Sequence, residues 1–186
     1  MLLQNAPMNE LSYRKKFDME IIRSPVMLKH SSIQKRGIQE YEYLVISTST
    51  FTIDDLKEMY DYSWAFSTMQ KFGILEHIST FYKRCHNLSF MKFYEIFFEY
   101  CNNNAYSLFG EEVEKLIEFR NNGYSGKGWD HHDSKLGEII WPFVEASWLR
   151  LTYNKKLLIR DIHSLVSYIE MNMAYYTSSI IINDLI

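Results

Sequence analysis

The feature that most constrains the fold is a stripe of aromatic side chains at helical spacing. Between residues 90 and 101, apolar residues recur every three or four positions, which places them along one face of an α-helix. The members of this stripe are Phe90, Phe93, Tyr94, Phe97, Phe98 and Cys101. A face this wide needs neighbouring helices to cover it, because aromatic area exposed to water is unfavourable. The sequence therefore predicts several helices packed around an aromatic core.

Cap and turn residues indicate where the helices begin and end. Thr52 and Asp55 have the spacing of a capping box, and Ser89 is a favoured N-cap directly before the aromatic stripe. Gly73 is the residue type favoured at a helix C-terminus. Further helices are expected over residues 75–85, 108–120, 143–153 and 157–173, and a glycine- and asparagine-rich break over residues 121–128. The last ten residues are apolar and fit either a closing strand or a frayed helix.

The N-terminal quarter differs from the rest. Met19–Leu28 and Tyr41–Phe51 are rich in β-branched and aromatic residues and are predicted to be extended, with Pro25 favouring an edge strand. The predicted fold class is mostly α: a helical domain over residues 52–186 preceded by a short extended or β segment over residues 1–51. With 186 residues, the chain needs no metal or disulfide to stabilise a core.

Composition argues against several classes of function. The net charge of −3 provides no basic field, so no nucleic-acid partner is expected. No apolar run approaches the roughly 20 residues that a membrane helix needs, and no secretory signal is visible, so no membrane partner is expected. The two cysteines, Cys85 and Cys101, form no disulfide framework and favour a reduced, cytoplasmic compartment. Both are predicted to pack on apolar helix faces.

The motifs with chemical potential are few. Trp129–Asp133 holds two adjacent histidines between aspartates, which suits a metal or acid–base site, but adjacent loop residues rarely converge on one centre, so a solvated loop is favoured. Gly126–Gly128 resembles only a fragment of a phosphate-binding loop. Glu138, Trp141 and Glu145 could line a pocket for a polar ligand or could lie on the surface; both interpretations stay open. No nucleophile–base pair is apparent, and no catalytic or metal residue is predicted.

The candidates for a surface that faces a substrate lie in and after the glycine-rich break. Glycines permit close backbone approach, and bulky aromatics interleaved with carboxylates are unusual for a plain solvent loop. The alternative is that the tryptophans merely anchor a long loop on the helices. The candidate residues are Tyr124, Trp129, His131, Glu138, Trp141 and Glu145.

Three blocks, in their order and spacing, resemble a known family. The first contains Asn5–Met8, Tyr13 and Ile21–Pro25; the second contains Tyr41–Phe51, Asp54–Tyr60 and Trp64; the third contains Gly126–Trp129, Leu136–Pro142 and Glu145–Leu149. Together they resemble the C-terminal region of cobalamin-binding radical S-adenosylmethionine (radical SAM) proteins, over nearly the whole chain.

The resemblance implies that residues 1–50 are the last strands of a partial barrel and that residues 52–186 form a helical cap. In that family a cobalamin-binding domain and a barrel with a CxxxCxxC loop hold cobalamin, S-adenosylmethionine and a [4Fe–4S] cluster. This chain has neither the cysteine triplet nor the cobalamin domain, so it is expected to bind none of these cofactors itself.

The sequence thus leads to one main functional hypothesis and one rival. The main one is a lid or substrate-pocket domain of a cobalamin-dependent radical SAM enzyme, not catalytic alone, whose partner is the barrel and cobalamin domain in cis or in trans. The rival is a free-standing helical protein-interaction domain. An independent small-molecule enzyme is the weakest interpretation, because no catalytic constellation is apparent.

Overall fold

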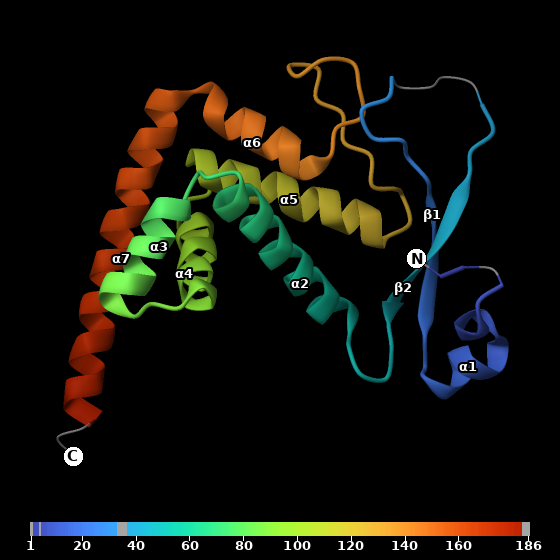
Figure 1. Cartoon of the computed structure of the whole chain (residues 1–186), viewed down its shortest axis with the longest axis horizontal. Coiled ribbons are helices and arrows are strands. Elements are labelled where there is room, and N and C mark those ends of the chain that lie inside the picture. The colour runs from blue at the N-terminus through green and yellow to red at the C-terminus, as the bar shows by residue number, and fades with distance from the viewer. Residues whose placement is uncertain (1, 4, 33–36, 184–186) are drawn as a thin grey trace. The chain divides into compact units, whose positions relative to one another are not determined.

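The computed structural model describes residues 2–3, 5–32 and 37–183, with side chains to residue 173. It is mostly helical, with a small two-stranded antiparallel sheet near the N-terminus, so the predicted fold class is confirmed (Figure 1). Packing divides the chain into two compact units. Unit 1 comprises Met1–Thr68 and Lys115–Ser147, and unit 2 comprises Met69–Glu114 and Trp148–Ile186.

Seven α-helices, two shorter helical segments and two strands make up the described chain. In order they are η1 (Pro7–Asn9), α1 (Leu11–Lys16), β1 (Glu20–Pro25), β2 (Tyr41–Ser47), α2 (Ile53–Ala65), the π-helical η2 (Phe66–Lys71), α3 (Glu76–His86), α4 (Phe90–Asn103), α5 (Leu108–Tyr124), α6 (Phe143–Tyr153) and α7 (Lys155–Asn183). No helix among the described residues is long and apolar enough to cross a membrane.

Both predicted N-terminal caps are present. The amide of Asp55 donates to the Thr52 hydroxyl at 3.2 Å, and the Asp55 carboxylate accepts from the Thr52 amide at 2.7 Å, which completes a capping box. At α4, the amide of Lys92 donates to the Ser89 hydroxyl at 3.1 Å. These contacts satisfy amides that the first helical turn leaves without a partner, and so they fix where α2 and α4 begin.

Two local predictions are wrong. The chain is still helical at residues 121–124, because α5 continues to Tyr124 and the loop begins only after it. Cys85 is exposed rather than packed on an apolar face, whereas Cys101 is buried as expected. Gly73 lies where predicted, just after the helical run ends: α2 continues as the π-helical η2 to Lys71, and Gly73 then has a φ of +85°, a conformation that glycine adopts without strain. The chain is helical to Asn183, so of the two alternatives for its end the helix is present over the described part.

The two strands pair with each other. Their antiparallel register places Ile22 opposite Leu44 and Arg23 opposite Tyr43. This pairing satisfies one edge of each strand within the described part of the chain. On the other side of β2, the amide of Leu2 donates to the carbonyl of Tyr43 at 2.7 Å. The sheet is thus a hairpin whose second strand is partly covered at its outer edge.

The aromatic stripe forms the core of unit 2. Phe93 and Phe97 are fully buried, and α4 packs against α3 and α7 (Figure 1). In the same unit, the Arg150 guanidinium donates two hydrogen bonds to the carboxylate of Glu112, and both side chains are largely buried. A buried carboxylate needs such a partner, because desolvation of an unpaired charge is strongly unfavourable.

A carboxylate from α7 caps α5 across the chain. Asp161 is 3% exposed and accepts from the amides of Leu108 and Phe109, the second at 3.3 Å. Both amides lie in the first turn of α5, where no intrahelical acceptor exists and where negative charge is favoured. Asp161 therefore joins α5 to α7 within unit 2.

We expect the Asp161→Ala variant to lose about 2–3 kcal/mol of unfolding free energy, because two buried amides lose a charged acceptor. Asp161→Asn should lose less, since the amide oxygen keeps one acceptor in place. Arg160→Ala removes the exposed guanidinium 3.9 Å from the Asp161 carboxylate; it is the matched control and should change stability by under about 0.5 kcal/mol, because a long, exposed ion pair contributes little. Urea unfolding followed by circular dichroism measures all three, and equal stability of Asp161→Ala and Arg160→Ala would contradict the capping role.

Candidate functional site

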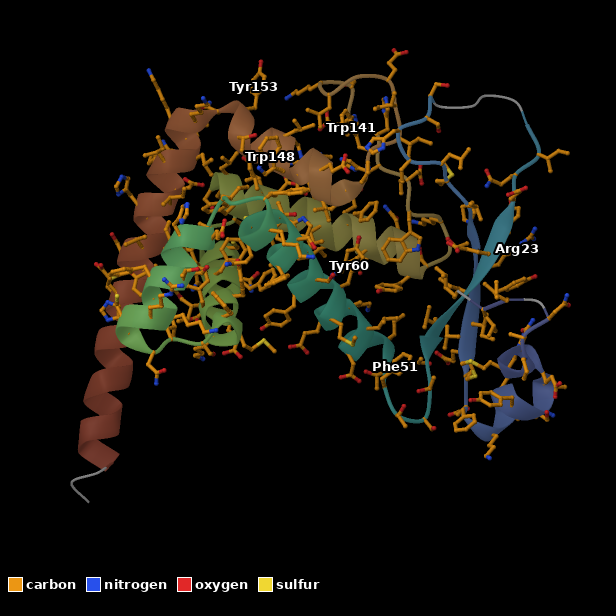
Figure 2. All side chains as sticks on the ribbon, in the orientation of Figure 1. Arg23, Phe51, Tyr60, Trp141, Trp148 and Tyr153 are labelled. Carbon is orange, nitrogen blue, oxygen red and sulfur yellow. The ribbon has the colours of Figure 1, made fainter. Side chains whose placement is uncertain are left out.

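The long loop between α5 and α6 is anchored in unit 1 by one indole. The Trp129 ring lies 5.1 Å from the ring of Tyr60, 5.5 Å from that of Phe119 and 4.9 Å from that of Tyr124. Tyr60 projects from α2 (Figure 2). Phe119 and Tyr124 belong to the C-terminal part of α5. A methyl group at Gly123 would fall 2.4 Å from the indole, so only glycine lets the ring approach the helix this closely.

A second set of ring contacts extends this cluster along the loop. The rings of Phe119 and Phe143 stack at 4.4 Å, and the His131 imidazole meets the Phe143 ring edge-on at 4.9 Å. Phe119 is 7% exposed and Phe143 is 3% exposed. The loop is therefore held at residues 129 and 131 by buried rings, and it is not a plain solvent loop.

A polar hollow of about 220 Å³ opens beside these rings. Its floor is Phe119, and polar side chains from α5 and from the loop surround it. The lining residues are Lys115, Glu118, Phe119, Asn122, Asp130, His131 and His132. We call this hollow the loop pocket. It offers hydrogen-bond donors and acceptors of both charges on a rigid aromatic base, an arrangement suited to orienting a polar group of a ligand.

A histidine–carboxylate pair lies at the start of α6. His30 Nε2 is 2.7 Å from Glu145 Oε2, and the Trp141 ring meets the imidazole edge-on at 5.9 Å. Backbone hydrogen bonds between His30 and Ile140 and between Ile140 and Ser31 hold this segment in place. About half of the His30 side chain is exposed, so the pair is accessible to solvent and to partners. The buried Trp141 indole nitrogen makes no hydrogen bond within the described part of the chain.

Lys29, next to His30 in the chain, connects this segment to the loop between α5 and α6. Its ammonium donates to the carbonyl of Trp129, one residue before the loop pocket begins. Burial lowers the pKa of Lys29 below its ordinary value, and the nearby carboxylates of Asp130 and Glu42 partly offset this effect. This hydrogen bond links the segment that contains Lys29 and His30 to the loop between α5 and α6.

The predicted site residues separate into three places. Tyr124, Trp129 and His131 come together in the aromatic cluster, where they support the loop pocket. Trp141 and Glu145 meet at His30. The Glu138 side chain is exposed and makes no hydrogen bond or ion pair with another described residue. The structure thus joins five of the six predicted residues into two neighbouring groups of unit 1 and leaves Glu138 apart.

Sequence reasoning missed the residues contributed by distant segments. Lys115, Glu118 and Asn122 recur at helical spacing on α5, and this pattern could have shown that they share one face. His30, Lys29 and Tyr60 are brought in by tertiary packing from segments about 70 to 115 positions away from their partners. No local signal in the sequence marks those three.

The cysteines do not fit the cofactors that the family resemblance implies. A [4Fe–4S] cluster of that family needs three thiolates on one loop, but this chain has two cysteines, on α3 and α4. Burial raises the pKa of the Cys101 thiol, which disfavours the thiolate that a metal needs. Within the described residues, no three His, Cys, Asp or Glu side chains converge as metal ligands. No chemical step through a cluster is therefore derived for this chain.

A largely buried ion pair lies under the aromatic cluster. Arg120 Nε is 2.7 Å from Asp61 Oδ1, and the two side chains are 14% and 20% exposed. Burial raises the pKa of Asp61 to about 6, because desolvation outweighs the lowering by Arg120, and Glu58 raises it further. The pair joins α2 to the end of α5 at the position where Tyr60 and Tyr124 contact Trp129.

The sequence matches no protein-family model, and no curated protein is significantly similar to it.

The Gly123→Ala variant tests the packing of the Trp129 indole against α5. We expect it to lose about 1–3 kcal/mol of unfolding free energy, because the new methyl group overlaps a ring that three aromatic neighbours hold in place. The better helix propensity of alanine would favour the opposite change, by up to about 1 kcal/mol. Asn121→Ala, at an exposed position of the same helix, is the control. Thermal unfolding distinguishes them, and a stabilised Gly123→Ala protein would show that the indole is free to move.

The Asp61 carboxylate should give the protein a specific pH dependence. A folded-state pKa near 6, above the unfolded value of 3.8, means that the folded protein holds this proton more tightly. The associated stability is present in full below pH 3.8 and is lost as the pH rises through 6. Relative to Asp61→Asn, the native protein should therefore lose roughly 1 kcal/mol between pH 4 and pH 7.5, after allowance for partial exposure.

Urea unfolding at a series of pH values measures this difference, in which contributions of the histidines cancel. Asp54→Asn, at an exposed position of α2, should show the same pH profile as the native protein. A constant difference between native protein and Asp61→Asn across this range would contradict the raised pKa.

Proposed function

We propose that this chain is a helical lid domain that completes the substrate pocket of a cobalamin-dependent radical SAM enzyme and is not catalytic alone. The observation that carries the proposal is the loop pocket, in which charged and hydrogen-bonding side chains stand on a floor of buried rings. Such a surface can orient a substrate, but it holds no nucleophile activated by an adjacent base. Shape and polar contacts are what a lid contributes to an enzyme whose chemistry lies elsewhere.

The rigidity of the loop supports this role. A lid for radical chemistry has to exclude water and keep substrate groups in one orientation, and a loop fixed by packed rings does so better than a flexible one. Trp129 and His131 are anchored in the aromatic cluster, so the polar groups between and beside them are held in place. Tyr124 belongs to the same anchor.

The partners and cofactors follow from the resemblance. The partner is a radical SAM barrel with its cobalamin domain, in cis or in trans, and it would carry the [4Fe–4S] cluster, S-adenosylmethionine and cobalamin. Trp141, Glu145 and Glu138 would then face the barrel mouth together with the loop pocket. The proposal places the protein in the cytoplasm, with neither nucleic acid nor membrane as a partner, in keeping with its net charge of −3.

A second candidate is a free-standing protein-interaction domain. The observation that favours it is the exposure of large aliphatic side chains in unit 1, of which Ile38 is 97% exposed and Leu28 is 66% exposed. Clustered apolar exposure marks contact surfaces in soluble proteins. This candidate needs no substrate and predicts no role for the loop pocket.

A search of the neighbouring coding sequence for a CxxxCxxC barrel protein, followed by co-expression of the two proteins, tests the lid proposal. We expect the two to co-purify, and we expect Glu118→Gln and His132→Gln to lower turnover of the complex by roughly tenfold or more, since misplaced substrate groups have effects of this size. Both substitutions are at exposed positions, so stability should change by under about 0.5 kcal/mol.

Glu114→Gln, at an exposed position of α5 outside the loop pocket, is the matched control and should leave turnover unchanged. Absence of any neighbouring CxxxCxxC protein, or full turnover in both pocket variants, would reject the lid role. Loss of turnover in parallel with loss of stability would instead show that the pocket residues are structural.

A further inference from the structure

The end of the β1–β2 hairpin carries an exposed apolar patch, which we call the hairpin-end patch. It consists of Leu3, Val26, Leu28, Ile38 and Tyr41, each at least 36% exposed. Val26 lines two adjoining hollows, one of about 280 Å³ that also includes Leu28 and Ile38 and one of about 370 Å³ that includes Leu3 and Tyr41. The patch is therefore continuous, and it combines projecting side chains with hollows that could receive them.

Charges of both signs lie beside the patch, and neither meets an opposite charge among the described residues. Arg23 projects from β1 (Figure 2). Its guanidinium lies over the Tyr41 ring at 3.6 Å and meets no carboxylate among the described residues. Glu40 lines both hollows, and its carboxylate contacts no cationic group within the same part of the chain. Arg23 and Glu40 are both exposed, so each is available to a group of opposite charge on another molecule.

We propose that the hairpin-end patch is the contact surface of a homodimer of this chain. A twofold contact requires a surface that is complementary to itself. This patch combines projecting apolar side chains with hollows, and a cationic side chain with an anionic one. With two copies related in this way, Ile38 of one copy enters a hollow of the other, and Arg23 faces Glu40 across the axis. Leu2 already bonds to the outer edge of β2 at Tyr43, so the contact is made by side chains rather than by an added strand.

The alternative occupant is an apolar segment of an unrelated protein. Such a segment would need a cation for Glu40 and a separate anion for Arg23, in the right places. A second copy supplies both without further assumption. The inference does not depend on the proposed lid function, because none of the patch residues lines the loop pocket.

Sedimentation velocity between about 1 and 200 µM tests the dimer, a range that suits an interface of modest size. We expect the mass to rise with concentration from 22.3 kDa toward twice that value. Ile38→Asp should raise the dissociation constant of the dimer at least about tenfold, since an anchor side chain at the centre of an interface has an effect of that order. Because Ile38 is almost fully exposed, the variant should fold normally.

A charge exchange makes the test specific for a twofold contact. Arg23→Glu and Glu40→Arg should each weaken the dimer, because each places like charges opposite one another. The double variant restores both pairs in reversed order and should dimerise again. Ile159→Asp, at a 55% exposed position of α7 in unit 2, is the control and should dimerise as the native chain does.

A chain that stays monomeric at the highest concentration would overturn the proposal, whether or not it binds another protein. So would a dimer that Ile38→Asp leaves intact, or a double variant no better than the single ones.

Discussion

The packing of one indole against one glycine determines the form of unit 1. Trp129 can lie against α5 only because Gly123 has no side chain, and a methyl group there would overlap the ring at 2.4 Å. From that seat the indole also contacts Tyr60 of α2, so a single side chain joins α2, α5 and the loop. Two further glycines bring the loop to the hairpin, since a side chain at Gly126 would strike the Arg23 carbonyl and one at Gly128 would strike Pro25. The glycines of this segment are thus required by close packing.

Local patterns predicted the helix starts and the aromatic core, whereas the tertiary packing of these glycines could not be predicted. Helix caps and the aromatic stripe are local patterns, and Thr52, Ser89 and Phe93 take the places that their spacing indicates. The end of α5 lies beyond its predicted position: asparagine and glycine favour a break in the helix, whereas Gly123 stays helical and leaves room for the ring. Tertiary packing overrode local propensity at that position.

The candidate site shows the same limit in another form. The aromatic and acidic residues after the break were identified from composition, and Trp129 and His131 lie together in the structure. Their partners His30, Lys29 and Tyr60 belong to distant segments, and a single sequence contains no signal for such pairs. The π-helical turn at Phe66 was also unpredictable, since it inserts a residue into a helix whose apolar period continues.

The distribution of charge distinguishes supporting groups from groups free to bind. In unit 2, Glu112 and Asp161 are almost completely buried, and Arg150 and two backbone amides respectively satisfy them. Such carboxylates are structural, because losing a partner would leave a buried charge. The loop pocket differs: Glu118, Asp130 and His132 are exposed and stand on rings that need no polar support. Exposed polar groups that lie beside packed rings are the groups of this unit best placed to meet a ligand.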